Sequence, residues 1–372
     1  MRYYIIAGEA SGDLHGSNLI KELAVIDPKA EFRCWGGDLM QAQGAMLVKH
    51  YRDLAFMGFF EVVANLPTIL KNIRLCKADI TKWKPDVVIF IDYPGFNLRI
   101  ASFARKAGFK TVYYISPQIW AWKESRIRTI RRDVDRMLVI LPFEKEFYAS
   151  RGMEVDFVGH PLLDAIDVNN KDPQWKEHHE IPAEKKLVAL LPGSRKQEIR
   201  AMLPAMLEAT RNRTDFYTVI ACAPSIQASF YRQWITESDS VRLVAGETQA
   251  VLQHADAALV TSGTATLETA LYGVPQVVAY KGHPVSVWIA RKLVKIRFIS
   301  LVNLIMDTEV VKELIQDQMN AESLRTELDK LLQDSHRNRL KTAYQELRQR
   351  LGVRGASKEA AKLIYNYLCS IN

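Results

Sequence analysis

The chain opens with YYIIAGEASGD (residues 3–13), a short apolar run that leads into a turn of small residues. The same arrangement recurs in LLPGSRKQE (190–198), so the sequence contains a loose internal repeat. An apolar run that ends in a Gly/Ser turn is typical of a buried parallel strand followed by a helix. The repeat therefore predicts two α/β domains that each begin in this way.

Further runs rich in β-branched and aromatic residues alternate with helical patterns after each opening stretch. They lie at 87–92, 111–116, 137–142, 155–159, 216–221, 241–245, 257–261 and 276–280. Residues 164–186 are polar and show no periodicity, which is typical of a linker, and from about Glu309 the pattern is helical and amphipathic. We therefore expect doubly wound parallel sheets in residues 1–165 and 187–344, a linker at 166–186, and final helices at about 345–372. These last helices are expected to pack on the first domain or on a partner subunit.

Composition excludes several classes of protein. The 372 residues contain no uninterrupted apolar stretch of the roughly 18 residues that a membrane span requires. The first residues lack the apolar core of a signal peptide, so we expect a cytoplasmic location. The four cysteines lie far apart without a CxxC pair, which suggests neither zinc nor a disulfide framework.

The net charge of +8 is concentrated in one segment, because residues 99–136 carry ten basic and three acidic side chains. Such an excess favours an anionic partner, which the charge alone leaves open between phosphates, a membrane surface and nucleic acid. Tyr113, Tyr114, Trp120 and Trp122 offer rings for stacking on bases. No nucleic-acid-binding fold signature accompanies these rings, so a nucleic-acid-binding module through 99–136 is the weakest alternative.

Two α/β domains of this kind predict a ligand cleft at the carboxyl ends of their strands, where the loops carry the chemistry. The first loop contains Glu9, Ser11 and Gly12 and matches neither a Walker A nor a GxGxxG pattern. Its small residues allow a ligand to approach the backbone, and an ordinary turn capped by Ser11 or Asp13 is the alternative.

A carboxylate follows the apolar run VVIFID, where Asp92 precedes Tyr93 and Pro94. At the end of a central strand such a carboxylate can act as a general base. The alternative is that Asp92 merely caps a helix that begins near Pro94.

Two loops of the second domain have the composition of anion sites. Ser194 and Arg195 follow one strand, and Arg195 either binds a phosphate or pairs with Glu198 or Glu208 on the surface. The other loop opens a helix with a hydroxyl-rich turn that suits a diphosphate, and a carboxylate one turn on can hold a ribose; mere helix capping is the alternative. Its candidate residues are Ser262, Gly263, Thr264 and Glu268.

Two further segments have a functional and a structural interpretation. Residues 56–76 are apolar with few charges and suit either a membrane interface or a buried crossover helix. The candidate membrane-facing residues are Phe59, Phe60, Leu66, Leu70 and Ile73. Asp133 and Asp135 form a DxD pattern, but it lies before a strand and among arginines, so we expect no metal site there.

The motifs taken together are more specific than any one loop, and their order and spacing resemble the lipid-A-disaccharide synthase family along nearly the whole chain. They are GEASGDLHG (8–16), KPDVVIFIDYPGFN (84–97), YYISPQIWAWKESRI (113–127), LPFEKEFY (141–148), FVGHPL (157–162), LLPGSR (190–195), TSGTATLE (261–268) and SLVNLI (300–305). The resemblance implies a GT-B glycosyltransferase, with two Rossmann-like domains around a cleft. It departs from the family at Val302, where proline is more usual.

The resemblance also implies roles and partners. The donor is UDP-2,3-diacylglucosamine and the acceptor is 2,3-diacylglucosamine 1-phosphate (lipid X), joined in a β(1→6) disaccharide with release of UDP. Inversion requires one base, and the resemblance assigns this role to Asp92. The resemblance also places Asn303 in the donor pocket, together with the loops of the second domain. The resemblance implies no metal or other cofactor. It implies work at the cytoplasmic face of an anionic inner membrane, and it allows a homodimer with exchanged C-terminal helices.

For His15 and His160 a structural hydrogen bond is the preferred interpretation. Two related enzyme classes stay open as alternatives: a UDP-N-acetylglucosamine 2-epimerase and a peptidoglycan-type N-acetylglucosaminyltransferase.

Overall fold

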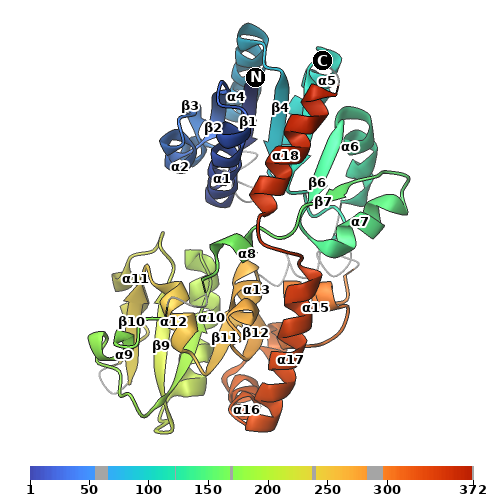
Figure 1. The fold of residues 1–372 in the computed structure, drawn as a ribbon. Helices are drawn as coiled ribbons and strands as arrows, with labels where there is room; N and C mark the ends of the chain where they lie inside the picture. Colours follow the sequence, from blue (N-terminus) through green and yellow to red (C-terminus); the bar gives the residue numbers. More distant parts are fainter. Residues whose placement is uncertain (55–65, 122, 168–170, 237–239, 283–295, 371–372) are drawn as a thin grey trace. The chain divides into compact units, whose positions relative to one another are not determined.

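The computed structural model describes residues 1–54, 66–121, 123–167, 171–236, 240–282 and 296–370, which form two compact units. Unit 1 comprises Met1–Asp164 and Leu351–Asn372, and unit 2 comprises Ala165–Arg350. Each unit is built on one parallel sheet with helices against it (Figure 1). No described helix is long and apolar enough to cross a bilayer.

Unit 1 contains a seven-stranded sheet of order β3-β2-β1-β4-β5-β6-β7. Its strands are β1 (Arg2–Ala7), β2 (Glu31–Gly36), β3 (Met46–His50), β4 (Val87–Ile91), β5 (Lys110–Tyr114), β6 (Arg136–Val139) and β7 (Asp156–Phe157). Its helices are α1 (Ala10–Ile26), α2 (Asp38–Ala42), η1 (Tyr51–Asp53), α4 (Leu66–Trp83), α5 (Pro94–Lys106), η2 (Glu124–Arg126), α6 (Ile127–Asp133), α7 (Pro142–Ala149) and α18 (Ala356–Cys369), with α8 (Leu162–Ala165) at the boundary. Strand β1 pairs with β2 on one side and with β4 on the other, so the strand order reverses between β1 and β4. In doubly wound sheets the ligand crevice is expected at the carboxyl ends of such a pair of strands.

Unit 2 contains a six-stranded sheet of order β10-β9-β8-β11-β12-β13. Its strands are β8 (Lys186–Leu191), β9 (Phe216–Cys222), β10 (Val241–Ala245), β11 (Ala257–Thr261), β12 (Gln276–Tyr280) and β13 (Lys312–Ile315). Its helices are α9 (Trp175–His178), α10 (Lys196–Thr210), α11 (Ala228–Arg232), α12 (Thr248–His254), α13 (Thr264–Leu271), α15 (Leu301–Met306), η3 (Gln316–Gln318), α16 (Ala321–Leu331) and α17 (Asp334–Arg350). The corresponding crevice lies between β8 and β11.

The central strands read as unbroken apolar runs because both faces of the sheet are covered. In β1, Tyr4 and Ile6 pack in one hydrophobic cluster, whereas Tyr3, Ile5 and Ala7 pack in the cluster on the other face. Alternate side chains point to opposite faces of a strand, so each face buries its own set.

All ten expected runs contain strands, and three further strands, β2, β3 and β13, were not predicted. Strand β3 lies at a sheet edge and is only half-buried, and β13 is a four-residue edge strand inside the region expected to be wholly helical. Strand β2 carries the charged residues Glu31 and Arg33. Strands that are partly exposed lack the continuous apolar pattern on which the prediction depended.

Much of the expected linker at 166–186 is part of the core of unit 2. Trp175 and Ile181 are buried in its hydrophobic cluster. The Trp175 ring stacks on His254 at 4.8 Å, and its indole N–H donates to Glu247 at 2.7 Å. The polar sequence around these two residues concealed their role.

The C-terminal helix completes unit 1. Figure 1 shows α18, in red, beside α1, although the two helices stand at opposite ends of the sequence. Ala360, Ala361 and Ile364 are buried in the same cluster as Leu19 and Leu23 of α1. Residues 351–355 lead from α17 back to unit 1 and form the return segment. The Gly355 N–H at its end donates a hydrogen bond to Asp164 Oδ1.

Candidate active site

The β1–α1 loop contributes two glycines whose roles lie in packing. A Cβ at Gly8 would lie 2.3 Å from the Tyr93 ring, and a Cβ at Gly12 would lie 3.0 Å from that of Ala7. Glu9 is the N-cap residue of α1 but its side chain makes no capping hydrogen bond, and Ser11 is exposed. Glu9 and Ser11 are therefore the side chains that this loop presents at the crevice.

Asp13 has a structural role that its position in the motif did not reveal. Its buried carboxylate accepts hydrogen bonds from the N–H groups of Gly37, Leu39 and Met40 at 2.7–3.1 Å. These groups lie at the start of α2, so Asp13 caps that helix, and the alternative in which it caps α1 is wrong.

Asp92 lies at the carboxyl end of β4 in a strained backbone. Its φ is 42°, that of Tyr93 is 48°, and that of the neighbouring Ile115 is 66°. Non-glycine residues in the left-handed region cost about 1–3 kcal/mol each and concentrate at functional sites. The N-cap residue of α5 is Tyr93 and no side chain caps this helix, so the structure does not support the alternative in which Asp92 is a cap.

Buried hydrogen bonds hold this turn in place. The Asn97 amide donates to the carbonyls of Asp92, Ile91 and Ile6 at 2.8–3.3 Å, and the Tyr113 hydroxyl donates to the Asp92 carbonyl. The backbone N–H of Asp92 donates to the carbonyl of Ile115. The backbone of Asp92 is fixed in this way, and its carboxyl group reaches solvent.

The surroundings of Asp92 suit a proton acceptor. Reduced hydration and the negative charge of Glu9 raise the pKa of the Asp92 carboxyl to about 6, and a backbone hydrogen bond from Tyr93 and the charge of Arg126 oppose this rise. A base works best when its pKa lies near the working pH. The carboxyl is therefore largely ionised at neutral pH and is still basic enough to take a proton.

The structure identifies partners or effects for several of the ten basic residues of segment 99–136. Arg105, Arg132 and Arg136 form ion pairs with Asp135, Asp133 and Asp156. Arg126 acts electrostatically on Asp92. The burial of Lys123 and the positive charge of Arg126 lower the pKa of Lys123. Arg126 therefore contributes positive charge near Asp92, with Lys123 close to it, and the sequence did not separate these two residues from the rest.

Both carboxylates of the DxD pattern have protein partners. Asp133 is buried and paired with Arg132, and Asp135 accepts the N–H of Thr111 at 2.9 Å. Within the described part of the chain, no group of three or more His, Cys, Asp or Glu side chains is placed to hold a metal ion.

His15 and His160 are neutral residues near the same end of unit 1. Burial lowers the pKa of His15 to about 4 and that of His160 to about 3, the latter with a contribution from His15. His160 Nδ1 accepts the N–H of Leu162 at 3.2 Å, which is the structural bond expected of it. For His15 the Nδ1 atom is buried without a hydrogen-bond partner among the described residues.

Unit 2 contains a cavity of about 390 Å³ at the carboxyl ends of β8 and β11. Ser194, Arg195, Gly263, Thr264 and Glu268 line it, together with Ser262. Burial raises the pKa of the Glu268 carboxyl, an effect that a hydrogen bond from Gln249 opposes. Six of the predicted donor-site residues are therefore brought together in one cavity.

Arg195 is engaged with Glu198 inside this cavity. Glu198 Oε2 accepts the N–H groups of Ser194 and Arg195 at 2.9 and 3.2 Å, and Glu198 Oε1 lies 3.0 Å from the guanidinium. The carboxylate thus holds the position at the start of α10 that suits an anion. The pairing alternative holds in this structure, and the spacing of Arg195 and Glu198 was the signal for it.

The turn between β11 and α13 offers backbone N–H groups more than hydroxyls. The Ser262 hydroxyl donates to the Ile299 carbonyl at 3.0 Å, whereas Gly263 and Thr264 are exposed to the cavity. No side chain caps α13, and the first N–H groups of a helix have no intrahelical partners. These N–H groups can donate hydrogen bonds to the oxygens of a diphosphate.

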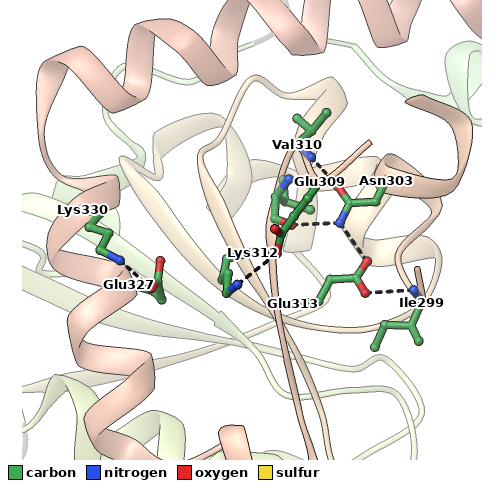
Figure 2. Close-up of polar contacts among 9 residues, drawn as sticks. Ile299, Asn303, Glu309, Val310, Lys312, Glu313, Glu327 and Lys330 are labelled. Atoms are coloured by element: carbon green, nitrogen blue, oxygen red, sulfur yellow. Dashed lines mark hydrogen bonds and ion pairs between the residues drawn. The ribbon is translucent and has the colours of Figure 1, made fainter. Parts of the chain in front are cut away.

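Asn303 is not exposed to this cavity, contrary to the prediction. It is fully buried in a hydrogen-bonded network with Glu313 and the backbone of residues 310 and 311 (Figure 2). Its side chain supports the loop near the turn of residues 262–264 between β11 and α13 (the donor turn), and it does not line the pocket.

The candidate membrane-facing residues separate into two groups. Leu70 is 44% exposed on α4, but Ile73 is 8% exposed and packs in the core of unit 1, so its assignment to the surface is wrong. Leu75, which the prediction did not include, is 45% exposed on the same helix. Phe59, Phe60 and the Leu66 side chain lie outside the described residues.

Known proteins resemble this chain in sequence and in fold. A family model described as lipid-A-disaccharide synthetase matches residues 3–366. The lipid-A-disaccharide synthase of Syntrophus aciditrophicus is 41% identical over 364 residues, which cover 96% of this chain and 95% of the relative. That of Geobacter metallireducens is 38% identical, with coverage of 99% and 97%.

Solved structures show the same fold at low sequence identity. The glycosyltransferase of kitacinnamycin superposes with a TM-score of 0.68 at 16% identity, covering 99% of each chain. The UDP-GlcNAc 2-epimerase of Neisseria meningitidis gives 0.65 at 12% identity, covering all of both chains. The fold is that of the GT-B glycosyltransferases, and the sequence matches show that the chain belongs to the lipid-A-disaccharide synthase family.

Proposed function

We propose that this glycosyltransferase moves 2,3-diacylglucosamine from UDP to the 6-hydroxyl of 2,3-diacylglucosamine 1-phosphate. The product is a β(1→6) disaccharide 1-phosphate, and UDP leaves. Family membership over nearly the whole chain is the observation that carries this proposal. The geometry that supports it is a base candidate at the crevice of unit 1 and an anion-binding cavity in unit 2.

The proposed reaction is a single inverting displacement. The Asp92 carboxylate takes the proton of the acceptor's 6-hydroxyl while that oxygen attacks the anomeric carbon of the donor. The bond between this carbon and the UDP oxygen breaks, and the electron pair leaves with UDP. Asp92 ends the step protonated and returns the proton to solvent.

The departing diphosphate carries the negative charge that the enzyme must stabilise. The N-terminal N–H groups of α13 supply dipoles, and Arg195 supplies a cation once it exchanges Glu198 for phosphate. Glu268 holds the ribose hydroxyls. No metal takes part in the proposed mechanism.

We assign the acceptor's 1-phosphate to the positive charge near Asp92. Lys123 and Arg126 are the basic residues that support this assignment. A sugar phosphate bound beside them would place the acceptor on the same unit as the base.

The acylated substrates suggest how the enzyme meets its membrane. We propose that the exposed face of α4, with Leu70, Leu75, Lys71 and Arg74, rests on the cytoplasmic surface of an anionic inner membrane. A homodimer is a prediction from the family resemblance alone.

The decisive experiment is a coupled assay of UDP release. UDP-2,3-diacylglucosamine and lipid X are supplied without added metal and with EDTA present, and we expect UDP release only when both are present. UDP release from UDP-N-acetylglucosamine without an acceptor, or its conversion to the 2-epimer, would contradict the proposal. Activity that EDTA abolishes would contradict the metal-free mechanism.

A further inference from the structure

A buried carboxylate lies beneath the donor turn of unit 2. Glu313 of β13 is 9% exposed, and it accepts the N–H groups of Ile299 and Ser300, each at 2.9 Å. It also accepts the side-chain amide of Asn303 at 2.8 Å (Figure 2). Three donors thus converge on one acid of an edge strand.

No cation neutralises this carboxylate among the described residues. The nearby lysines pair elsewhere, Lys312 with Glu309 and Lys330 with Glu327 (Figure 2). A buried carboxylate without a cation is costly, and its desolvation is offset only by hydrogen bonds to the ionised form. A site of this kind suggests that the loop must be held in one geometry.

Asn303 extends the network from Glu313 to the next loop. Its oxygen accepts the N–H groups of Val310 and Val311 at 2.8 and 2.9 Å, and its nitrogen donates to the Val311 carbonyl as well as to Glu313. Both donor hydrogens and both acceptor positions of the amide are therefore used. This side chain acts on the loop and not on a ligand.

The network reaches the donor cavity through one further contact. The Ile299 carbonyl accepts the hydroxyl of Ser262, whose N–H donates to the Ala279 carbonyl. Ser262 is thereby held between β12 and the segment that Glu313 fixes. The next residues, Gly263 and Thr264, line the cavity where α13 begins.

We propose that Glu313 and Asn303 are positioning residues for donor binding. They fix Ile299 and Ser300, and these fix Ser262, so that the turn presents its N–H groups to the diphosphate of a UDP-sugar. The identity of the ligand rests on the proposed function. Loosening Glu313 is expected to weaken the binding of UDP without changing the chemistry at Asp92.

The test compares Glu→Gln substitutions at two positions that lie four residues apart. Glu313→Gln keeps the shape of the side chain but turns an NH₂ group toward N–H donors, whereas Glu309→Gln is the control at an ion pair in which Glu309 is 51% exposed. For Glu313→Gln we expect the Kd of UDP and the KM of the donor to rise about fivefold to tenfold, as partial loss of a charged hydrogen bond predicts. The kcat and the KM for lipid X should change less than twofold, and Glu309→Gln should match the parent enzyme.

Two outcomes would overturn the inference. One is a fall in active enzyme with the Kd of UDP and the KM of the donor unchanged, which indicates a purely structural role. The other is equal behaviour of the two Gln variants. If the parent enzyme binds UDP normally while these outcomes occur, the inference fails and the proposed function stands, whereas a parent enzyme that does not bind UDP contradicts the proposed function.

A second variant keeps the test valid if Glu313→Gln does not fold. Ser262→Ala cuts the same chain of contacts at its other end and leaves Glu313 intact. We expect it to weaken UDP binding by a similar factor, and in the double variant the two effects should be less than additive because both act through Ile299. Unchanged UDP binding in Ser262→Ala, or fully additive effects, would contradict the proposal.

Discussion

At the scale of single residues, Asp92 combines a strained left-handed backbone with a raised carboxyl pKa. The left-handed backbone of Asp92 and Tyr93 is maintained by Asn97 and Tyr113, which bind the backbone carbonyl of Asp92 and not its carboxyl group. The carboxyl group accepts a hydrogen bond from the Tyr93 backbone. With a pKa of about 6, this carboxyl is mostly ionised at neutral pH. The geometry and the charge state both favour a base over a structural acid.

Replacing this carboxylate by an amide tests its role as a base. Asp92→Asn should lower turnover by about 10²–10⁴-fold, because the amide cannot take the acceptor's proton. UDP affinity measured by calorimetry should stay the same, since the donor cavity lies in unit 2. Asp38→Asn is the control, the same change at a carboxylate that is 66% exposed. Turnover near the parent level would contradict the assignment.

The pKa of Asp92 predicts a pH profile. Because the ionised form is the active one, kcat/KM should fall with a limiting slope of one as the pH drops below about 6. Glu9→Gln removes a negative charge that raises this pKa, so the midpoint should move to lower pH. A midpoint that stays in place or moves upward would exclude Glu9 as a cause of the shift.

Ionisation of an acid in an ion pair stabilises the folded state, whereas ionisation of the Asp92 carboxyl destabilises it. Its pKa is raised in the folded state, so its ionisation favours unfolding, and this penalty is absent below the unfolded value and complete above pH 6. Asp92→Asn should therefore raise the thermal midpoint at pH 8 relative to the parent, with a smaller difference at pH 4. The quantity to compare is the thermal midpoint of Asp92→Asn minus that of the parent. A smaller difference at pH 8 than at pH 4 would contradict the raised pKa.

At the scale of elements, helix α4 separates a core face from an exposed apolar face. Ile73, Cys76 and Ile80 are buried in the core of unit 1, while Leu70 and Leu75 project outward. Lys71 and Arg74 are exposed on the same helix. Exposed leucines beside basic residues are the composition of a helix that lies on an anionic membrane.

Removing these leucines tests the membrane surface. Leu70→Ser with Leu75→Ser should reduce cosedimentation with anionic vesicles, because the helix loses its exposed apolar area. Val25→Ser with Val353→Ser is the control, since these residues are 72% and 82% exposed on other elements. Stability should change little in either pair, as surface substitutions usually do. Equal binding by the parent and the α4 variant would rule out this face.

At the scale of the whole molecule, unit 1 needs both ends of the chain. Its sheet is complete by residue 157, but one face of α1 stays uncovered until α18 returns more than 300 residues later in the sequence. Ile364 and Leu368 are each 1% exposed there. The fold of unit 1 is therefore finished only when the last helix is made.

Truncating one of these side chains tests the return. Ile364→Ala should lower the free energy of unfolding of unit 1 by about 2–5 kcal/mol, from lost burial and the cavity left behind. Val353→Ala, on the exposed return segment, should stay within about 0.5 kcal/mol of the parent. UDP affinity should be equal in all three proteins. An Ile364→Ala protein as stable as the parent would show that α18 leaves α1 in solution.

The amino-acid sequence determined the α/β class, ten of the strands and the loops that carry the candidate chemistry. It did so because central parallel strands are buried on both faces and their Gly/Ser turns leave a local pattern. Asp92 and the residues of the donor cavity stand at such turns, so their neighbourhood in the sequence identified them. The family match along the chain assigned the class of reaction.

Only the tertiary structure decided which side chains face a ligand and which support the fold. Some residues that stand in motifs or apolar runs are buried and support the fold. They are Asp13, which binds Gly37; Ile73, which packs in the core of unit 1; and Asn303, which binds Glu313. The helical pattern left two packings of the final helices open, and the structure shows that α18 packs on unit 1. Glu313 left no local signal at all. The physical reason is that burial and hydrogen-bond partners depend on contacts between remote segments, and a pattern of neighbouring residues does not contain them.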